Sequence, residues 1–330
     1  MRFGYLRLVL VLALVLAALL GLLVGQFPLR VSQVLQSLVS GGAAGTAADV
    51  VLWELRLPRV MAAILVGAAL AAAGATYQAM FRNPLVSPDI LGVSAGAGLG
   101  AVLAIFFTLP LVGVQFLAFL GGLGAVALVY GVSLANKRHD PVLVLVLAGV
   151  VVSTFLGAAI SLIKILADPY TQLPTITFWL LGGLNTVRLA ELAWALPLVL
   201  LGLLPIYLLR WRINLLSLSD TEAQSLGLNT ALLRLGLIFC ATLMTAVTVS
   251  FTGIIGWVGL VIPHMARLIV GPEFSRLLPT SLLMGATFLL LTDNLARNAT
   301  HMELPLGVLT ALIGAPFFLY LLIRGNERAG

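Results

Sequence analysis

Long apolar runs, each with at most one charged residue, follow one another along almost the whole chain, and they limit its fold more than any other feature. Ten such runs stand out, at residues 8–27, 60–80, 90–107, 114–134, 142–166, 192–209, 231–251, 254–269, 278–295 and 304–323. A helix needs about 20 apolar residues to cross a bilayer. The runs therefore predict an all-α membrane protein with ten transmembrane helices, in which residues 1–330 form one transmembrane domain.

The low charge content excludes a soluble protein. Only 9% of the residues are charged, whereas soluble domains carry about 25%. The net charge of +6 does not indicate nucleic-acid binding, because the arginines are scattered at the ends of apolar runs rather than gathered into a patch. That distribution is typical of a multi-pass protein oriented by its positive charges, so we expect a cell inner membrane protein that binds no nucleic acid.

One part of the chain leaves the number of spans open. No charge occurs between residues 235 and 263, and only Thr252 and Gly253 suggest a turn. With ten spans and a cytoplasmic N-terminus, twelve of the eighteen lysines and arginines are cytoplasmic; with nine spans the two sides carry nine each. The positive-inside rule favours the first arrangement, which places both termini in the cytoplasm.

The first 30 residues have the basic start and apolar stretch of a signal peptide. The uncharged stretch at residues 8–29 is longer than the 7–15 residues typical of a signal peptide, and no A-x-A cleavage site follows it. We therefore expect a first transmembrane helix that is retained.

Small residues recur at every fourth position in two runs: Gly67, Ala71 and Ala75 in one, and Gly92, Gly96 and Gly100 in the other. This spacing lets helix backbones approach closely in lipid. Ordinary helix packing explains the pattern, and a pore-lining role for these faces is the alternative.

The stretch FRNPLVSPDILG, at residues 81–92, places an arginine, an asparagine and two prolines between two apolar runs. Pro84 disfavours α conformation at Asn83, so the chain is expected to be extended there. Non-helical backbone at membrane depth is tolerated only against protein or a water-filled cavity. Asn83 and Leu85 are therefore candidates for a functional turn, with a plain connection as the alternative.

The residues that follow this turn need no functional explanation. Ser87, Pro88 and Asp89 suit the N-cap, N1 and N2 positions of the next helix. A serine side chain accepts a backbone N–H there, proline presets φ, and a carboxylate suits the positive end of the helix.

A second polar segment, residues 210–229, is longer than a simple connection requires. Ser219 and Glu222 form a capping-box pattern. Gly227 suits the position just past a helix end, and Asn229 suits the cap of the next span. The pattern predicts a short cytoplasmic helix that could receive a partner; a plain surface loop is the alternative.

Catalytic motifs are missing. The sequence contains no GxxxxGK[ST], no G-x-S-x-G and no HExxH, so we expect no phosphate cradle, serine nucleophile or zinc site in this chain. His139 beside Asp140 suggests a solvated cluster at a helix end rather than a catalytic pair. Ion-driven carriers place carboxylates deep in a span. The candidate here, Asp293, is expected to pair with Arg297 four residues later, so the chain looks like a transport channel without its own energy source.

Five stretches carry a family resemblance: LRLPR at residues 55–59, VGAALAAAG at 66–74, FRNPLVSPDILGVSAGA at 81–97, GWVGLVIPHMARLIVG at 256–271 and ELPLGVLTALIGAPFFLYLL at 303–322. They resemble the permeases of bacterial iron-siderophore, haem and vitamin B12 ABC importers, which are type II importers. The likeness runs from about residue 50 to residue 323.

The resemblance implies a vitamin B12 permease-like subunit of ten helices that works as a homodimer. Two cytoplasmic ATP-binding subunits would hydrolyse ATP–Mg, and a periplasmic or lipid-anchored binding protein would deliver the substrate. This chain would be a transport subunit and not an enzyme, and it would bind no cofactor or metal itself.

The resemblance also assigns residues. The turn of Asn83, Pro84 and Leu85 would be a cytoplasmic gate. The ATPase would dock on Ser219, Asp220, Glu222, Ala223, Leu226 and Gly227. The binding protein would dock through acidic residues on Arg56, Arg59 and Arg297. A second gate would fall in residues 139–143, which differ from the small hydroxyl residues of the B12 permease.

The sequence leaves alternatives open for the substrate and for the class of transporter. The substrate is expected to be a ferric siderophore or haem, because residues 142–166 are apolar with only scattered hydroxyls; cobalamin comes next and molybdate last. An ion-coupled secondary carrier is the main alternative of another class, and a membrane-embedded enzyme is a further one.

Overall fold

The computed structural model describes residues 2–25, 27–135, 141–300 and 302–327, and this part of the chain is entirely helical apart from its connections. Seven of its helical segments are long and apolar enough to cross a membrane: α1 (Arg2–Leu23), the continuous segment of α3 (Ala47–Val50), η1 (Val51–Arg56) and α4 (Leu57–Met80), α6 (Leu111–Ala135), α7 (Pro141–Leu166), α9 (Leu189–Leu208), α12 (Thr230–Thr252) and α14 (Phe274–Asn298). Three further apolar helices join them: α5 (Val93–Phe106), α13 (Val258–Val270) and α15 (Leu306–Glu327). The ten expected runs lie on these helices, which confirms an all-helical membrane protein.

The uncharged stretch with an uncertain number of spans forms two helices. α12 ends at Thr252, and α13 begins at Val258. Gly253 and Trp257 both have a φ of +69°, so the chain reverses between them instead of continuing as one long helix. This confirms that residues 235–263 belong to two helices, as the charge distribution predicted.

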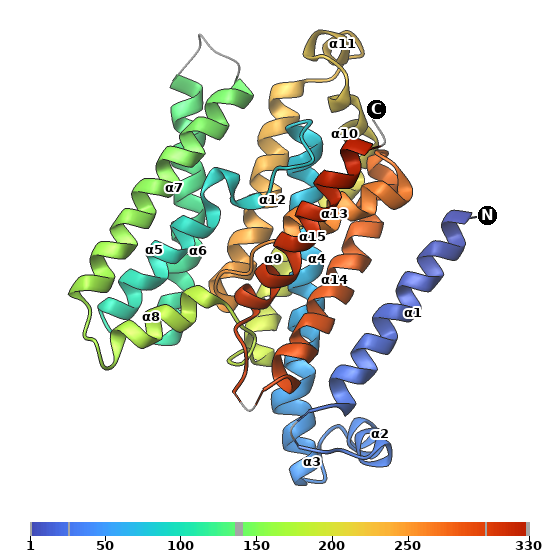
Figure 1. Cartoon of the computed structure of the whole chain (residues 1–330), viewed down its shortest axis with the longest axis vertical. Helices are drawn as coiled ribbons and strands as arrows, with labels where there is room; N and C mark the ends of the chain where they lie inside the picture. The colour runs from blue at the N-terminus through green and yellow to red at the C-terminus, as the bar shows by residue number, and fades with distance from the viewer. Residues whose placement is uncertain (1, 26, 136–140, 301, 328–330) are drawn as a thin grey trace.

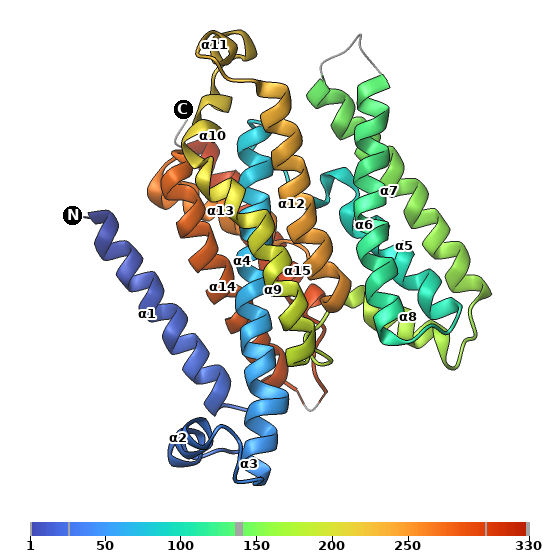
Figure 2. The same cartoon turned by 180° about the vertical axis from the view of Figure 1, so that it is seen from behind.

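Figures 1 and 2 show α4 running through the middle of the bundle, with α5 to α8 on one side and α1 on the other. The short helices α2 (Val31–Ser40) and α3 lie at one end, called here the α3 end. The helix α11 (Asp220–Ser225) lies at the opposite end, called here the α11 end. Because α4 runs from one end to the other, residues near its start lie at the α3 end and residues just after it lie at the α11 end.

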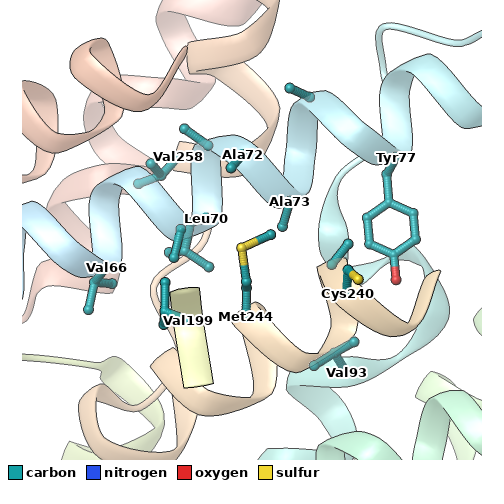
Figure 3. Packing of buried hydrophobic residues seen from close by; sticks show 14 of the residues in the cluster. Val66, Leu70, Ala72, Ala73, Tyr77, Val93, Val199, Cys240, Met244 and Val258 are labelled. Carbon is teal, nitrogen blue, oxygen red and sulfur yellow. The ribbon is translucent and has the colours of Figure 1, made fainter. Parts of the chain in front are cut away.

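The buried core surrounds α4 (Figure 3). Leu70, Ala73 and Tyr77 of α4 lie beside Cys240 and Met244 of α12 in one buried cluster. The Tyr77 hydroxyl shares a hydrogen bond of 2.9 Å with the hydroxyl of Thr242. Lipid is as apolar as these side chains, so the close packing itself, together with such polar contacts, stabilises the helix associations.

The small residues expected at helix contacts do lie at them. A Cβ added at Gly67 would overlap the carbonyl of Gly285 on α14, and one at Gly96 would overlap the carbonyl of Gly121 on α6. The pairs α4–α14 and α5–α6 also have the most extensive contacts in the described structure. Ordinary helix packing therefore accounts for this spacing. Gly92 is different, because its φ of +81° places it in the turn before α5.

Several elements were not expected from the sequence. These are α2, α3, the π-helical turn η1, the 3₁₀ turn η2 (Pro88–Leu91) and α8 (Gln172–Leu181). The π turn has a local cause: Pro58 has no N–H to donate within the helix, and the Leu57 N–H bonds the carbonyl of Leu52, five residues back.

The expected helix start at residues 87–89 was wrong in detail. Ser87 occupies the cap position of η2, but its side chain makes no capping hydrogen bond within the described residues. The 3₁₀ turn ends at Gly92, and α5 begins only at Val93. The Asp89 carboxylate accepts a hydrogen bond from Ser94 instead, so it stabilises the junction between η2 and α5.

Candidate functional sites at the two ends of the bundle

Arg56 at the α3 end caps another helix. Its guanidinium donates to the carbonyls of Leu22 at 2.7 Å and Leu23 at 3.0 Å, and also to the carbonyl of Phe27. The last carbonyls of a helix have no partner within it, and a positive charge suits that negative end. Arg56 is buried, and it fixes the end of α1 against η1.

Arg59 and Arg297 share a buried carboxylate. Arg59 Nε lies 2.8 Å from Asp293 Oδ1, and Arg297 Nε lies 3.2 Å from Asp293 Oδ2. The second contact is an ion pair without the alignment of a hydrogen bond. Arg59 Nη1 also lies 2.8 Å from Glu303 Oε2. These four residues are called here the four-charge cluster, and they join α4, α14 and the segment before α15.

The predicted Asp293–Arg297 pair is confirmed. Arg56, Arg59 and Arg297 are all buried, with partners in this chain. They line one cavity of about 300 Å³ together with Glu54 and Glu303.

At the α11 end, the turn of residues 81–85 has a defined geometry. The Arg82 N–H bonds the Ala79 carbonyl, and the Asn83 N–H bonds the Gln78 carbonyl. This is the Schellman pattern that ends many helices, with Arg82 in the left-handed position usually taken by glycine. Its φ is +51°, and such a conformation costs a non-glycine residue about 1–3 kcal/mol.

The Asn83 side chain shapes the rest of that turn. Its Oδ1 accepts the N–H of Leu85 at 2.9 Å, which is an Asx turn. Leu85 is exposed, while Val86 is buried. Below the turn, Gln78 Nε2 donates to the carbonyls of Val86 and Leu260. Hydrogen bonds therefore hold the backbone of this turn in place, and the Leu85 side chain is exposed at its surface.

The predicted helix in residues 210–229 is confirmed as α11. Ser219 Oγ accepts the Glu222 N–H at 3.3 Å, and Glu222 Oε2 accepts the Ser219 N–H at 2.9 Å. Gly227 follows the helix with a φ of +81°, and Asn229 Oδ1 caps α12 through the Leu232 N–H. Ala223 is buried and Leu226 is exposed. Before α11 come α10 (Arg210–Asn214) and the 3₁₀ turn η3 (Leu215–Ser217).

Sequence reasoning missed the connection between these two segments. Arg82 Nε donates to the Leu216 carbonyl at 2.6 Å, and Arg82 Nη2 lies 2.9 Å from Asp220 Oδ1. Arg234 at the start of α12 donates to both oxygens of Asp220 at 2.8 Å. The hydrogen bonds from Arg234, and then the charges of Arg234 and Arg82, hold the Asp220 pKa below its usual value, although partial burial opposes them. The sequence gives no sign that Arg82 adopts a positive φ. The contact of Arg82 with Leu216 and Asp220 therefore could not be predicted from the sequence.

A cavity of about 480 Å³ lies beside this connection. It is lined by Gln78, Arg82, Asn83, Asn214, Arg267 and Phe274, among others. Three segments thus meet around it: the turn after α4, the segment that leads to α11, and the α13–α14 connection. The second expected gate cannot be compared in this way, because His139 and Asp140 lie outside the described residues.

Known proteins match this chain in both sequence and structure. The profile described as the FecCD transport family matches residues 12–324. The chain therefore belongs to the FecCD transport family, and the resemblance predicted from its motifs is confirmed. It is a multi-pass membrane protein of the ABC transporter permease type. That family assignment identifies a transport protein.

Relatives with different named substrates match at comparable levels. A "Probable iron chelatin transport system permease protein" of Helicobacter pylori is 47% identical over 202 residues, which are 61% of this chain and 62% of that protein. The molybdate import system permease protein MolB of Haemophilus influenzae is 41% identical over 206 residues, 62% of this chain and 61% of that protein. The matched region spans less than two thirds of these relatives.

A solved structure matches almost the whole chain. It is described as "An inward-facing conformation of a putative metal-chelate type ABC transporter", and it superposes with a TM-score of 0.89 at 39% identity, covering 97% of this chain and 99% of that one. The PsaBC structure from Streptococcus pneumoniae matches with a TM-score of 0.60 at 17% identity, over 86% of this chain and 94% of that one. The second match shows a shared fold alone.

Proposed function

We propose that this chain is the membrane permease of an ATP-driven importer for iron chelates, either a ferric siderophore or haem. The observation that carries the proposal is the match to the metal-chelate type transporter over nearly the full chain. The iron chelatin relative supports the substrate class. Cobalamin and molybdate are the alternative substrates, and relatives named for both match this chain at more than 40% identity.

In this proposal the chain crosses the cell inner membrane ten times, with both termini and α11 in the cytoplasm. Ten apolar helices are available for these crossings among the described residues. The translocation path lies between two copies of the chain, and two ATP-binding subunits supply ATP–Mg. The chain itself holds no cofactor.

The α11 end receives the ATPase in this proposal. Ser219, Asp220, Glu222 and Gly227 shape α11 and its ends, Ala223 anchors it, and Leu226 presents an exposed apolar side chain. The turn of Asn83, Pro84 and Leu85 forms the cytoplasmic gate, because it projects Leu85 from an anchored base. ATP binding would move α11, and the gate would then change access to the path.

The α3 end receives the substrate-binding protein. Arg56, Arg59 and Arg297 surround one cavity, and an acidic side chain of the binding protein would enter it. Such a side chain would compete with Glu303, which is 42% exposed, rather than with Asp293, which is fully buried. In this proposal Arg59 exchanges Glu303 for an acidic residue of the binding protein when the two proteins dock.

The test is ATP hydrolysis by the complete complex in lipid, with the binding protein loaded in turn with ferric siderophore, haem, cobalamin or molybdate. Stimulation by either iron chelate above the empty binding protein supports the proposal. Stimulation by cobalamin or molybdate alone would replace the proposed substrate. Uptake without ATP, driven by an ion gradient, would instead establish a secondary carrier.

A further inference from the structure

One connection in the structure joins the proposed ATPase-docking helix to the proposed gate. Arg82 lies one residue before Asn83, and its guanidinium reaches both the Leu216 carbonyl and the Asp220 carboxylate. Leu216 is fully buried in η3, just before α11, and Asp220 is the first residue of α11. Arg82 therefore holds two points of the docking segment, one in its backbone and one in its side chain.

The backbone of Arg82 gives an independent reason to single it out. Glycine is the favoured residue in the left-handed position that Arg82 occupies. A strained non-glycine residue persists where the surrounding contacts determine it. Here those contacts come from the side chain itself, which a glycine would lack, so the arginine has a task beyond ending α4.

Asp220 is fixed from a second direction. Arg234 at the start of α12 holds both of its oxygens in a forked contact, which is the strong geometry for an arginine–carboxylate pair. Arg234 is largely buried, whereas the side chains of Arg82 and Asp220 are 40% and 44% exposed. The Asp220–Arg234 pair therefore joins α11 firmly to the start of α12, whereas the contact between Arg82 and Asp220, which leads to the gate, is more exposed.

We propose that Arg82 is a positioning residue that transmits displacement of α11 to the turn of Asn83, Pro84 and Leu85. The inference rests on the proposed function, because it takes α11 as the ATPase-docking helix and that turn as the gate. When the ATPase moves α11, the Leu216 carbonyl and the Asp220 carboxylate move with it. Arg82 then pulls or releases the turn. Without Arg82, α11 still docks, but its movement no longer sets the gate.

Arg82→Gly is the decisive variant, because glycine suits the left-handed position and preserves the turn while removing the contact. The complex of the chain with its ATPase is reconstituted in lipid, with a nitroxide label on Leu85→Cys in a Cys240→Ala background. Label-to-label distances between the two copies are measured by pulsed EPR, with and without ATP–Mg²⁺ and vanadate. Co-purification of the ATPase and its hydrolysis rate are measured on the same samples.

The expected result is that Arg82→Gly keeps the ATPase bound and active but loses more than half of the nucleotide-dependent change in distance. Arg82→Gln should behave in the same way, whereas the matched control Arg276→Gln should not, because Arg276 pairs with its neighbour Glu273.

Two outcomes would contradict the inference in distinguishable ways. A full-sized distance change in Arg82→Gly, in a complex that assembles normally, overturns the relay and leaves the proposed function intact. Failure of the unmutated chain to bind the ATPase, or to change its label distance with nucleotide, overturns the proposed function and the relay with it.

Discussion

Arginines at the two ends of α4 are held in opposite ways. Arg59, at the α3 end, is buried and bonds a carboxylate that is fully buried itself. Arg82, at the α11 end, is 40% exposed and bonds a half-exposed carboxylate on a short helix. A buried pair cannot lose one partner without leaving an unpaired charge in a medium of low dielectric constant. An exposed pair can separate at little cost because water replaces the partner.

This difference matches the tasks proposed for the two ends. The four-charge cluster joins α4, α14 and the segment before α15 into a fixed frame. The Arg82 contacts join a turn to a short helix, both at the surface, where movement costs less. An arginine thus holds helices together through a buried ion pair at the α3 end, whereas at the α11 end an arginine makes an exposed ion pair that can separate at little cost.

The largest expected effect is at Asp293. Asp293→Asn leaves Arg59 and Arg297 buried without their shared counter-charge, and breaking a buried pair in this way costs about 3–5 kcal/mol. We expect a large loss of folded protein and a lower unfolding temperature in detergent. Glu273→Gln is the matched control, since its exposed pair with Arg276 should contribute at most about 1 kcal/mol. Equal losses in both variants would remove the contrast between buried and exposed pairs.

A second effect should come from the helix contact that positions Arg59 beside Asp293. Gly67→Val would force α4 away from Gly285 on α14, and overpacking of this kind costs about 1–3 kcal/mol. Gly124→Val is the control, because a Cβ at Gly124 meets no described atom within 4 Å. The measurement is thermal unfolding of both variants. If Gly67→Val is as stable as the control, the close α4–α14 contact does not contribute to the frame.

A smaller effect is expected at Glu303. Glu303→Gln removes only the exposed partner of Arg59, and Asp293 remains in place. Stability should fall by at most about 1 kcal/mol. If an acidic residue of the binding protein competes for Arg59, docking should become tighter, as measured by titration of the binding protein into the reconstituted permease. Weaker docking would show that Glu303 contributes to the docking surface itself.

The smallest effect is the pH dependence of the Asp220 contacts. Arg234 and Arg82 lower the Asp220 pKa in the folded protein. The contribution of this carboxylate is therefore complete above its unfolded pKa of about 4 and is lost as the pH falls through the lower folded value. The difference in unfolding temperature between the unmutated chain and Asp220→Asn should be present at pH 7 and narrow below pH 4. A constant difference across that range would show that the charge of Asp220 does not stabilise the contact.

The class of fold and much of the local geometry follow from patterns within short stretches of the sequence. Apolar runs of spanning length predicted the membrane helices, because lipid leaves the backbone no other way to satisfy its polar groups. Capping residues predicted α11, since Ser219, Glu222 and Gly227 act through hydrogen bonds to residues at most five positions apart. The i+4 spacing likewise predicted the Asp293–Arg297 pair.

The partners of the arginines, in contrast, depend on how distant parts of the chain pack together. Arg59 meets Asp293 across 234 positions in the sequence, and Arg82 meets Asp220 across 138. Burial of Arg56 depends on the carbonyls at the end of α1, which carry no sequence signal of their own. Spacing along one helix reveals neighbours within that helix, but which helices lie side by side depends on packing of the whole bundle. Whether an arginine is free or already paired is settled by that packing.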